Sequence, residues 1–402
     1  MLLVMDRLRK ISSISLIVLA SKQSYILDEE GEEMKRVVIG QAGGPTAVIN
    51  NSLAGFLENI ADAECYAIDC GFEGLVKNRI RFIDSRLNQH ILQNRHTPGA
   101  ILGSGRYHVS EEDFKKIITN LKDTGIDSVV MAGGNGTMWA LSRLSEHARA
   151  AGYDLQVLGI PKTVDNDLGM TDHSPGFPSA AKYVGFSTRD MISDLESMRN
   201  FEKIRIVETM GRYGGWLAAA ARLFHPITRK DSPLLVYIPE KHLTREMFLE
   251  DIDKTLKKHG VAFVVVSEGV KLGDQEVVKT SSNGRNILGG IATILAKEAE
   301  NHFQVMARDE CLGMNQRSFS LSVSSVDREE SYQSGKEAAI RLLKDESDKM
   351  ICIGREENNT YKARYLGVSL KEVAEAGERR MPEEFTRDPE AYIEWLKPLI
   401  SY

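Results

Sequence analysis

Cysteine is scarce in this sequence, and its four copies follow no functional spacing. Cys65, Cys70, Cys311 and Cys352 form no C-x-x-C pair, and the nine histidines are too scattered to supply a set of metal ligands. This spacing argues against a disulfide framework and a zinc site, and it fits a reduced, cytoplasmic compartment. A strong charge of one sign is also lacking, because the net charge of -6 comes from interspersed acidic and basic residues. The sequence therefore gives no electrostatic footprint for nucleic acid.

Long apolar runs are missing too. The strongest candidate is residues 11–20 (ISSISLIVLA), which follow the mostly basic residues 7–10. This pattern resembles a weak signal peptide, but it is far shorter than the ~20 apolar residues of a membrane helix. Because the chain that follows has no disulfide framework, we expect residues 1–34 to be a poorly ordered extension of a cytoplasmic protein with no membrane partner.

The common glycine motifs for nucleotides are absent: no G-x-x-x-x-G-K-[ST] occurs, and no G-x-G-x-x-G follows a strand. Two other units of strand, glycine loop and helix are present. Residues 35–40 lead into Gly43 and Gly44, and residues 125–132 lead into G-G-N-G-T, where Thr137 is expected to cap the next helix. Glycines at a helix start let backbone N–H groups approach an anion. These units predict phosphate binding.

A pair of carboxylates follows the buried strand predicted at residues 155–160. In I-P-K-T-V-D-N-D, Asp165 and Asp167 would point to opposite sides of an extended chain. Pro161 and Asn166 favour a turn that brings both to one ligand. A loop with no chemical role is the alternative interpretation for an isolated D-N-D.

Composition bounds the architecture. A chain of 402 residues with 42% apolar content can form one large or two medium cores. Further buried strands are predicted at residues 204–208, 234–239 and 261–266, and they alternate with helices. The expected fold class is α/β, with two doubly wound, mostly parallel sheet domains and the active site in the cleft between them.

Five motifs in a fixed order resemble the phosphofructokinase family: G-P, L-G-S-G-R, G-G-N-G-T, P-K-T-V-D-N-D and M-G-R, between residues 44 and 212. The resemblance covers residues 35–327. It implies a donor-binding domain at residues 35–176 with a return segment at about 316–365, a sugar-phosphate domain at 177–315, and a C-terminal tail at 366–402. It also implies small-molecule substrates, Mg²⁺, a place in glycolysis, and a homodimer or homotetramer.

The resemblance assigns roles to individual residues. Asp165 is the base, Asp167 supports the base or the metal, and Thr163 hydrogen-bonds the acceptor or the phosphoryl group. The catalytic set is Asp165, Asp167, Thr163, Arg212 and Arg106. The donor set is Gly43, Gly44, Gly134, Asn135, Gly136, Thr137 and Lys162, and the metal set is Asn135 and Asp167. The acceptor set is Thr163, Met210, Gly211, Arg212, Glu268, Arg308, Arg317 and Lys203.

Several positions depart from the family pattern. Asn135 stands where an aspartate is usual, Lys203 replaces an arginine that comes from a neighbouring subunit in tetrameric relatives, and Met314 replaces a histidine or tyrosine. For the donor, Gly136 permits ATP, whereas Lys162 favours pyrophosphate. We expect pyrophosphate-dependent phosphorylation of fructose 6-phosphate; the alternatives are an ATP-dependent enzyme, a kinase of another sugar or polyol, and a non-catalytic phosphate-binding protein.

Overall fold

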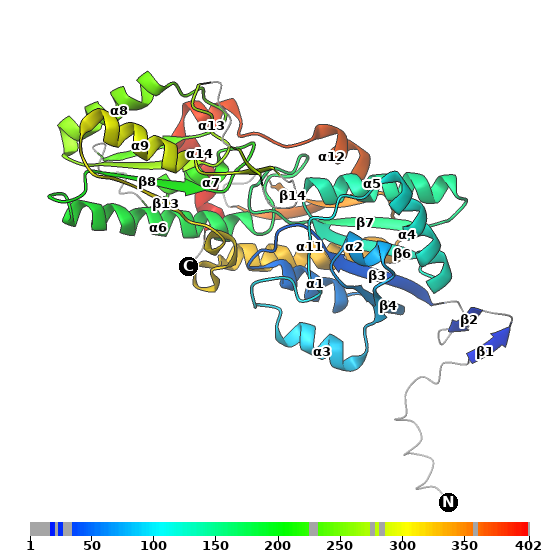
Figure 1. The fold of residues 1–402 in the computed structure, drawn as a ribbon. Helices are drawn as coiled ribbons and strands as arrows, with labels where there is room; N and C mark the ends of the chain where they lie inside the picture. The colour runs from blue at the N-terminus through cyan, green and yellow to red at the C-terminus, as the bar shows by residue number, and fades with distance from the viewer. Residues whose placement is uncertain are drawn as a thin grey trace, which may run out of the picture.

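The chain folds around two main β-sheets that lie side by side in the computed structural model (Figure 1). The structure describes residues 34–224, 232–273, 289–356 and 361–400, and the backbone alone of four short strands. The prediction that residues 1–34 are poorly ordered falls mostly outside this described part. The four short strands form two antiparallel pairs: β1 (Ile17–Ala20) with β2 (Gln23–Ile26), and β11 (Val278–Thr280) with β12 (Asn286–Leu288).

The first sheet has seven strands in the order β15-β14-β7-β6-β3-β4-β5. Its five inner strands are parallel, and its two edge strands run antiparallel to their neighbours. Along β3, Val38 packs into one helical layer while Val37 and Ile39 pack into the other, as expected for a strand covered on both faces. The strands are β3 (Lys35–Gln41), β4 (Ala63–Ile68), β5 (Ile80–Phe82), β6 (Ser128–Gly133), β7 (Gln156–Pro161), β14 (Lys349–Arg355) and β15 (Ala363–Ser369).

Helices cover both faces of this sheet. Local sequence sets their ends: in α4, Ser110 and Asp113 form a capping box that satisfies backbone N–H groups of the first turn. The prediction that Thr137 caps α5 is wrong, because the helix already begins at Asn135 and its N-cap is Gly134. The helices are α1 (Ile49–Leu57), α2 (Phe72–Val76), α3 (Ser85–Gln93), α4 (Glu111–Thr124), α5 (Asn135–Ala150), α11 (Ser325–Leu343) and α12 (Leu370–Ala376).

The second sheet has four parallel strands in the order β13-β8-β10-β9. In β10, Phe263 and Val265 belong to one core, and Val264 and Val266 to the other. The predicted α/β class with two mostly parallel sheets is thus confirmed. The elements are α6 (Phe177–Ser197), β8 (Ile204–Thr209), α7 (Trp216–Ala219), η1 (Ala220–Arg222), β9 (Leu234–Tyr237), α8 (Arg245–His259), β10 (Ala262–Ser267), α9 (Ile291–Phe303), β13 (Ala307–Cys311), α10 (Asn315–Ser318) and η2 (Ser320–Ser322).

The C-terminal segment is built into both units. After α12, which packs against α5, the chain crosses to the second unit and forms α13 (Glu383–Arg387), α14 (Pro389–Leu396) and η3 (Lys397–Leu399) (Figure 1). Tyr392 and Leu396 are fully buried in the core that contains Trp216. Residues 366–400 are therefore a folded part of the structure, not a trailing tail. In the described part of the chain, no helix has the length and apolar content needed to cross a bilayer.

Candidate active site

Loops from both sheets line one cavity of about 900 Å³. The neighbouring parallel strands β3, β6 and β7 deliver residues 42–45, 134–137 and 162–167 to it from their carboxyl ends. The second sheet adds residues that follow β8 and β10. Ligands collect at such edges because the chain leaves the sheet there. The predicted site residues in the lining are Gly43, Gly44, Arg106, Gly134, Asn135, Gly136, Thr137, Lys162, Thr163, Asp165, Asp167, Met210, Arg212, Glu268 and Arg317.

A tight turn places the two predicted carboxylates in this cavity. Asn166 has a left-handed backbone with φ 54°, a conformation that asparagine tolerates better than most residues. The Thr163 hydroxyl accepts from the Asp165 N–H at 3.1 Å and donates to Asp167 Oδ1 at 3.2 Å. The predicted turn is confirmed, and it gives Asp167 a fixed partner.

The surroundings of the Asp165 carboxyl group favour its protonation. Its Oδ1 is inaccessible to solvent and has no hydrogen-bond partner in the described part of the chain. Burial, together with the nearby charges of Asp167 and Glu268, raises the pKa of Asp165 to about 7, although Arg106 and Lys162 act in the opposite direction. A carboxylate with this pKa can take a proton near neutral pH and still lose it again.

The glycine loop after β3 is shaped by two cations. Buried Lys162 donates from Nζ to the Gly44 carbonyl at 2.7 Å, and burial lowers its pKa to about 8. A Cβ at Gly43 would lie 3.1 Å from this Nζ, and one at Gly44 would lie 2.7 Å from Nη1 of Arg317. Gly43 is required by its left-handed backbone, with φ 78°, and a side chain at Gly44 would have to displace the Arg317 guanidinium.

Positive charge is concentrated on this loop. The guanidinium groups of Arg106 and Arg317 both lie within 4 Å of the position that a Gly44 Cβ would take. Burial and the charge of Arg106 lower the pKa of Arg317, as expected for like charges held together. Arg212 enters from the second sheet and lines the same cavity. Such a cluster is suited to a polyanion.

Oxygen donors for a cation lie beside the carboxylates. Asn135 donates from Nδ2 to the Asp167 carbonyl at 2.9 Å, which leaves its Oδ1 buried and without a described partner. Among the described residues, no group of three His, Cys, Asp or Glu side chains could hold a metal alone. One carboxylate and one amide oxygen fit Mg²⁺, which usually keeps waters and binds substrate phosphates as well.

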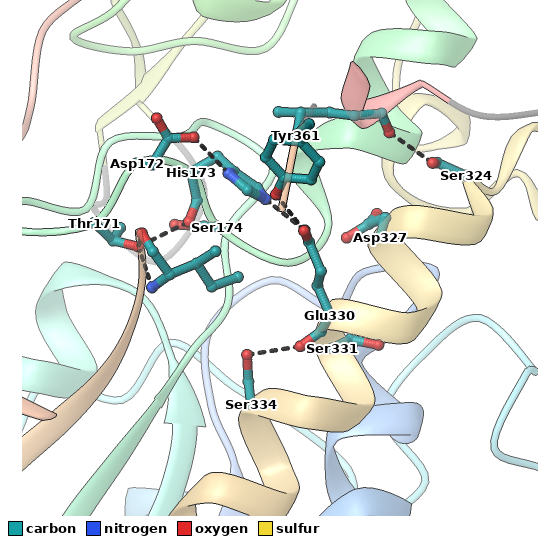
Figure 2. Close-up of polar contacts among 12 residues, drawn as sticks. Thr171, Asp172, His173, Ser174, Ser324, Asp327, Glu330, Ser331, Ser334 and Tyr361 are labelled. Carbon is teal, nitrogen blue, oxygen red and sulfur yellow. Dashed lines mark hydrogen bonds and ion pairs between the residues drawn. The ribbon is translucent and has the colours of Figure 1, made fainter. Parts of the chain in front are cut away.

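The loop that follows the carboxylates is anchored by a buried histidine. His173 lies between Asp172 Oδ2, 2.8 Å from its Nδ1, and Glu330 Oε2, 2.6 Å from its Nε2 (Figure 2). Tyr361 donates to the other oxygen of Glu330, and Arg355 donates to Asp172 at 2.9 Å. The histidine therefore joins the end of the loop that carries Asp165 and Asp167 to α11.

Two predicted acceptor residues lie elsewhere. Lys203 precedes β8 and Arg308 is the second residue of β13, whereas the cavity lies at the opposite ends of these strands. Six residues of extended strand separate Lys203 from that end by roughly 20 Å. Arg308 instead lies 3.5 Å from Glu202 Oε2, with its guanidinium 5.6 Å from the Phe201 ring centroid. Neither reaches this cavity within the chain. Gly211 adjoins it between Met210 and Arg212, with its carbonyl bonded to Ser267 Oγ at 2.5 Å.

Residues that the motifs did not predict also line the cavity. The rings of His108 and Trp139 stack with centroids 6.3 Å apart and planes 9° apart, beside the donor loops. Trp139 lies four residues after Asn135 in α5, so helical spacing could have found it. Glu378 arrives from the C-terminal segment, and no local pattern marks it.

Comparisons with known proteins agree with this geometry. The family model named Phosphofructokinase matches residues 36–342. A sulfofructose kinase of Alkalicoccus urumqiensis is 42% identical, covering 91% of this chain and 96% of that protein. A pyrophosphate--fructose 6-phosphate 1-phosphotransferase of Methylococcus capsulatus is 33% identical over 90% of both chains.

The solved structures extend the match to the fold. The crystal structure of a pyrophosphate-dependent phosphofructokinase from Nitrosospira multiformis superposes with a TM-score of 0.82 at 31% identity, covering 92% of both chains. The family's five motifs, which are scattered over the sequence, meet around a single cavity in this chain. Sequence, fold and site together place this protein among the phosphotransferases of the phosphofructokinase family.

Proposed function

We propose that the protein transfers a phosphoryl group from pyrophosphate to the 1-hydroxyl of a fructose that carries an acidic group at C6. The proposal is carried by one observation: a carboxylate with a pKa near 7 shares a cavity with four cationic side chains. Phosphoryl transfer needs both, because the acceptor must lose a proton and the transferring oxygens must be neutralised. The cations are Arg106, Lys162, Arg212 and Arg317.

The roles of the residues follow from their positions. Asp165 takes the proton of the acceptor's 1-hydroxyl as that oxygen attacks the terminal phosphorus. Arg106 and Arg212, from opposite sheets, stabilise charge on the transferring phosphoryl group. Lys162 and the Gly43–Gly44 backbone hold the donor. Asp167 accepts a hydrogen bond from Thr163 and, with Asn135 Oδ1, would hold Mg²⁺. When bound, the ion would neutralise charge on the donor's phosphates.

A direct transfer assay tests the proposal. The protein is incubated with pyrophosphate or ATP and with fructose 6-phosphate, sulfofructose or an unphosphorylated polyol, and the phosphorylated acceptor is identified. We expect a product only with a C6 acid. Turnover of a neutral polyol with the higher kcat/KM would overturn the acceptor class, and no transfer from either donor would favour a non-catalytic phosphate-binding protein.

Two C6 acids are candidates for the acceptor. The sequence motifs favour fructose 6-phosphate, and the acceptor named by the relative that is 42% identical favours sulfofructose. Met314 supports the second candidate. Met314 is 56% exposed and lines the cavity with Arg317, and its thioether offers no hydrogen to a phosphate dianion. A sulfonate carries only one negative charge and needs fewer donors.

Met314→His is expected to shift acceptor preference toward fructose 6-phosphate. A hydrogen bond to a charged group contributes about 1.5–3 kcal/mol, so the ratio of kcat/KM for fructose 6-phosphate to that for sulfofructose should rise roughly 10- to 100-fold. Met314→Leu is the matched control, because it keeps the volume and adds no donor. An unchanged ratio in the histidine variant would remove Met314 from acceptor selection.

Features of the donor site favour two different phosphoryl donors, pyrophosphate and ATP. The Lys162 ammonium lies against the glycine loop, where a compact charge suits compact pyrophosphate. Yet nothing lies within 4 Å of the position that a Gly136 Cβ would take, and the stacked rings of His108 and Trp139 offer a surface for a nucleobase. ATP is therefore the second candidate.

Paired variants distinguish these donors. With pyrophosphate, Lys162→Gly should lower kcat/KM by roughly 100-fold, the scale of one lost charge-assisted contact, and Trp139→Ala should have little effect. With ATP as the true donor, Trp139→Ala should instead raise its KM, because stacking on a base is lost. Donor kcat/KM values for the three proteins give the answer, and ATP outperforming pyrophosphate in the wild type would falsify our choice.

A further inference from the structure

The C-terminal segment that joins α12 to α13 crosses directly over the catalytic loop. Its Arg379 donates from the backbone N–H to the Asp167 carbonyl at 2.7 Å. The guanidinium donates from Nη2 to the Asp172 carbonyl at 2.9 Å and to the Asn166 carbonyl at 3.3 Å, and from Nη1 to the Thr171 carbonyl. One residue thus bonds both ends of the loop that begins at the two catalytic carboxylates.

The same segment is fixed to the second unit. The Arg379 guanidinium lies 4.5 Å from the ring centroid of Trp216, and the Trp216 indole N–H points back to the Arg379 carbonyl at 3.5 Å. Glu240 accepts from Gly215 N–H at 3.0 Å and from Met381 N–H at 2.9 Å. Gly215 and Trp216 directly follow the loop that carries Arg212. Arg379 therefore contacts the loop of the two carboxylates and the start of α7, which directly follows the Arg212 loop.

The partners of this guanidinium indicate why an arginine is present. It bonds three backbone carbonyls and no carboxylate of the described residues, so its planar fork of donors matters more than an ion pair. Burial lowers the pKa of Arg379 to about 10, so the group remains charged at neutral pH. Backbone carbonyls of an irregular loop have no partners in a sheet or helix. The hydrogen bonds from Arg379 satisfy three of them and so fix the path of the loop.

We propose that Arg379 is a positioning residue: it holds the Asp165–Asp167 turn against the Arg212 loop and so fixes the spacing of base and cation across the cleft. The catalytic consequence rests on the proposed function. A misplacement of about 1 Å at a reacting group can cost roughly 100-fold in rate, so Arg379 can affect turnover although it does not line the cavity.

The test compares Arg379→Met, which keeps the stem over Trp216 but removes the donors, with the matched control Arg380→Met at the exposed neighbouring position. We expect the first variant to lower kcat roughly 10- to 100-fold with KM values within about threefold, and the control to change neither. Added to Asp165→Asn, Arg379→Met should lower kcat no further, because the residue acts through the base. Independent, additive losses would overturn the proposal.

Hydrogen exchange separates this inference from the proposed function. In Arg379→Met without substrate, amides of residues 163–176 and 211–216 should exchange faster, while those of the first sheet keep their wild-type rates. This result is expected even if the wild type transfers no phosphoryl group. Unchanged exchange in these two loops would overturn the proposal. If Arg379→Met does not fold, Arg379→Lys serves, with faster exchange and a smaller loss of kcat expected because one donor group remains.

Discussion

Replacing Asp165 by asparagine is expected to lower kcat by roughly 10²–10⁴-fold, the usual cost of losing general-base help. Asparagine has nearly the same shape and cannot accept the hydroxyl proton. The carboxyl group is suited to this task because burial and two neighbouring carboxylates raise its pKa to about 7, while cations that would hold the donor surround it. KM values should change little, because asparagine keeps the shape of the side chain and help from a base is given mainly in the transition state.

The pH profile gives this prediction a second readout. A base must be deprotonated, so kcat/KM of the wild type should rise with pH through about 7, and Asp165→Asn should lose this limb. Asp123→Asn, on the exposed end of α4, is the control for the substitution itself. If the asparagine variant keeps kcat within a few-fold of the wild type at saturating substrate, Asp165 is not the base.

Most parts of the site that the sequence predicted share one property: they lie within a few residues of a strand's carboxyl end, and Arg106 is an exception. Gly43, Asn135 and Asp165 follow β3, β6 and β7, and parallel pairing brings these ends together without any further information. The turn at Asn166 could also be predicted from the sequence, because asparagine tolerates a left-handed backbone better than most residues.

The direction of two strands explains why two of the predicted acceptor residues lie away from the cavity. Arg308 and Lys203 resemble acceptor ligands by position, but they occupy the amino ends of β13 and β8. The motif order does not show which end of a strand faces the cavity. Their predicted contact with an acceptor would therefore have to come from a second copy of the chain, as the resemblance implies for Lys203.

The supports of the loop could not be predicted because they depend on distant residues. Arg379 is 207 residues from Asp172, and Glu330 is 157 residues from His173. Neither pairing has a local pattern, and a lone histidine or arginine is usually a satisfied or solvated side chain. Only the folded C-terminal segment and α11 bring these groups to the loop.

Among substitutions outside the cavity, Glu330→Gln is expected to be strongly destabilising. It removes one charge from a buried group in which His173 is fully inaccessible and Glu330 is 3% exposed (Figure 2). Breaking a buried ion pair by removing one partner typically costs about 3–5 kcal/mol. Glu329→Gln, at the exposed neighbouring position of α11, should change the free energy of unfolding by less than about 0.5 kcal/mol.

The dependence of stability on pH shows whether Glu330→Gln acts by removing a charge or by disturbing the packing. Burial alone would lower the pKa of His173, but Glu330 and Asp172 raise it to about 9. A folded-state pKa above the ordinary value of about 6.5 contributes stability that is fully present below pH 6.5 and is lost as pH rises through 9. Burial likewise opposes ionisation of Asp172, yet His173 and Arg355 lower its pKa to about 2, so its contribution disappears only as pH falls toward 2.

Denaturant unfolding at pH 6 and pH 9 therefore measures what the ion pair of His173 and Glu330 contributes to the free energy of unfolding. The wild type should lose stability between these values, and Glu330→Gln should lose less, because the pKa of His173 falls toward its ordinary value when one carboxylate is gone. The raised carboxyl pKa of Asp165 acts equally in both proteins and cancels in the difference. Burial, with help from Glu330, raises the pKa of Asp327 to about 6, an effect that lies mostly below the pH range compared. Equal losses in the two proteins would show that His173 is neutral in the fold, and the network would then be held by hydrogen bonds without a buried charge.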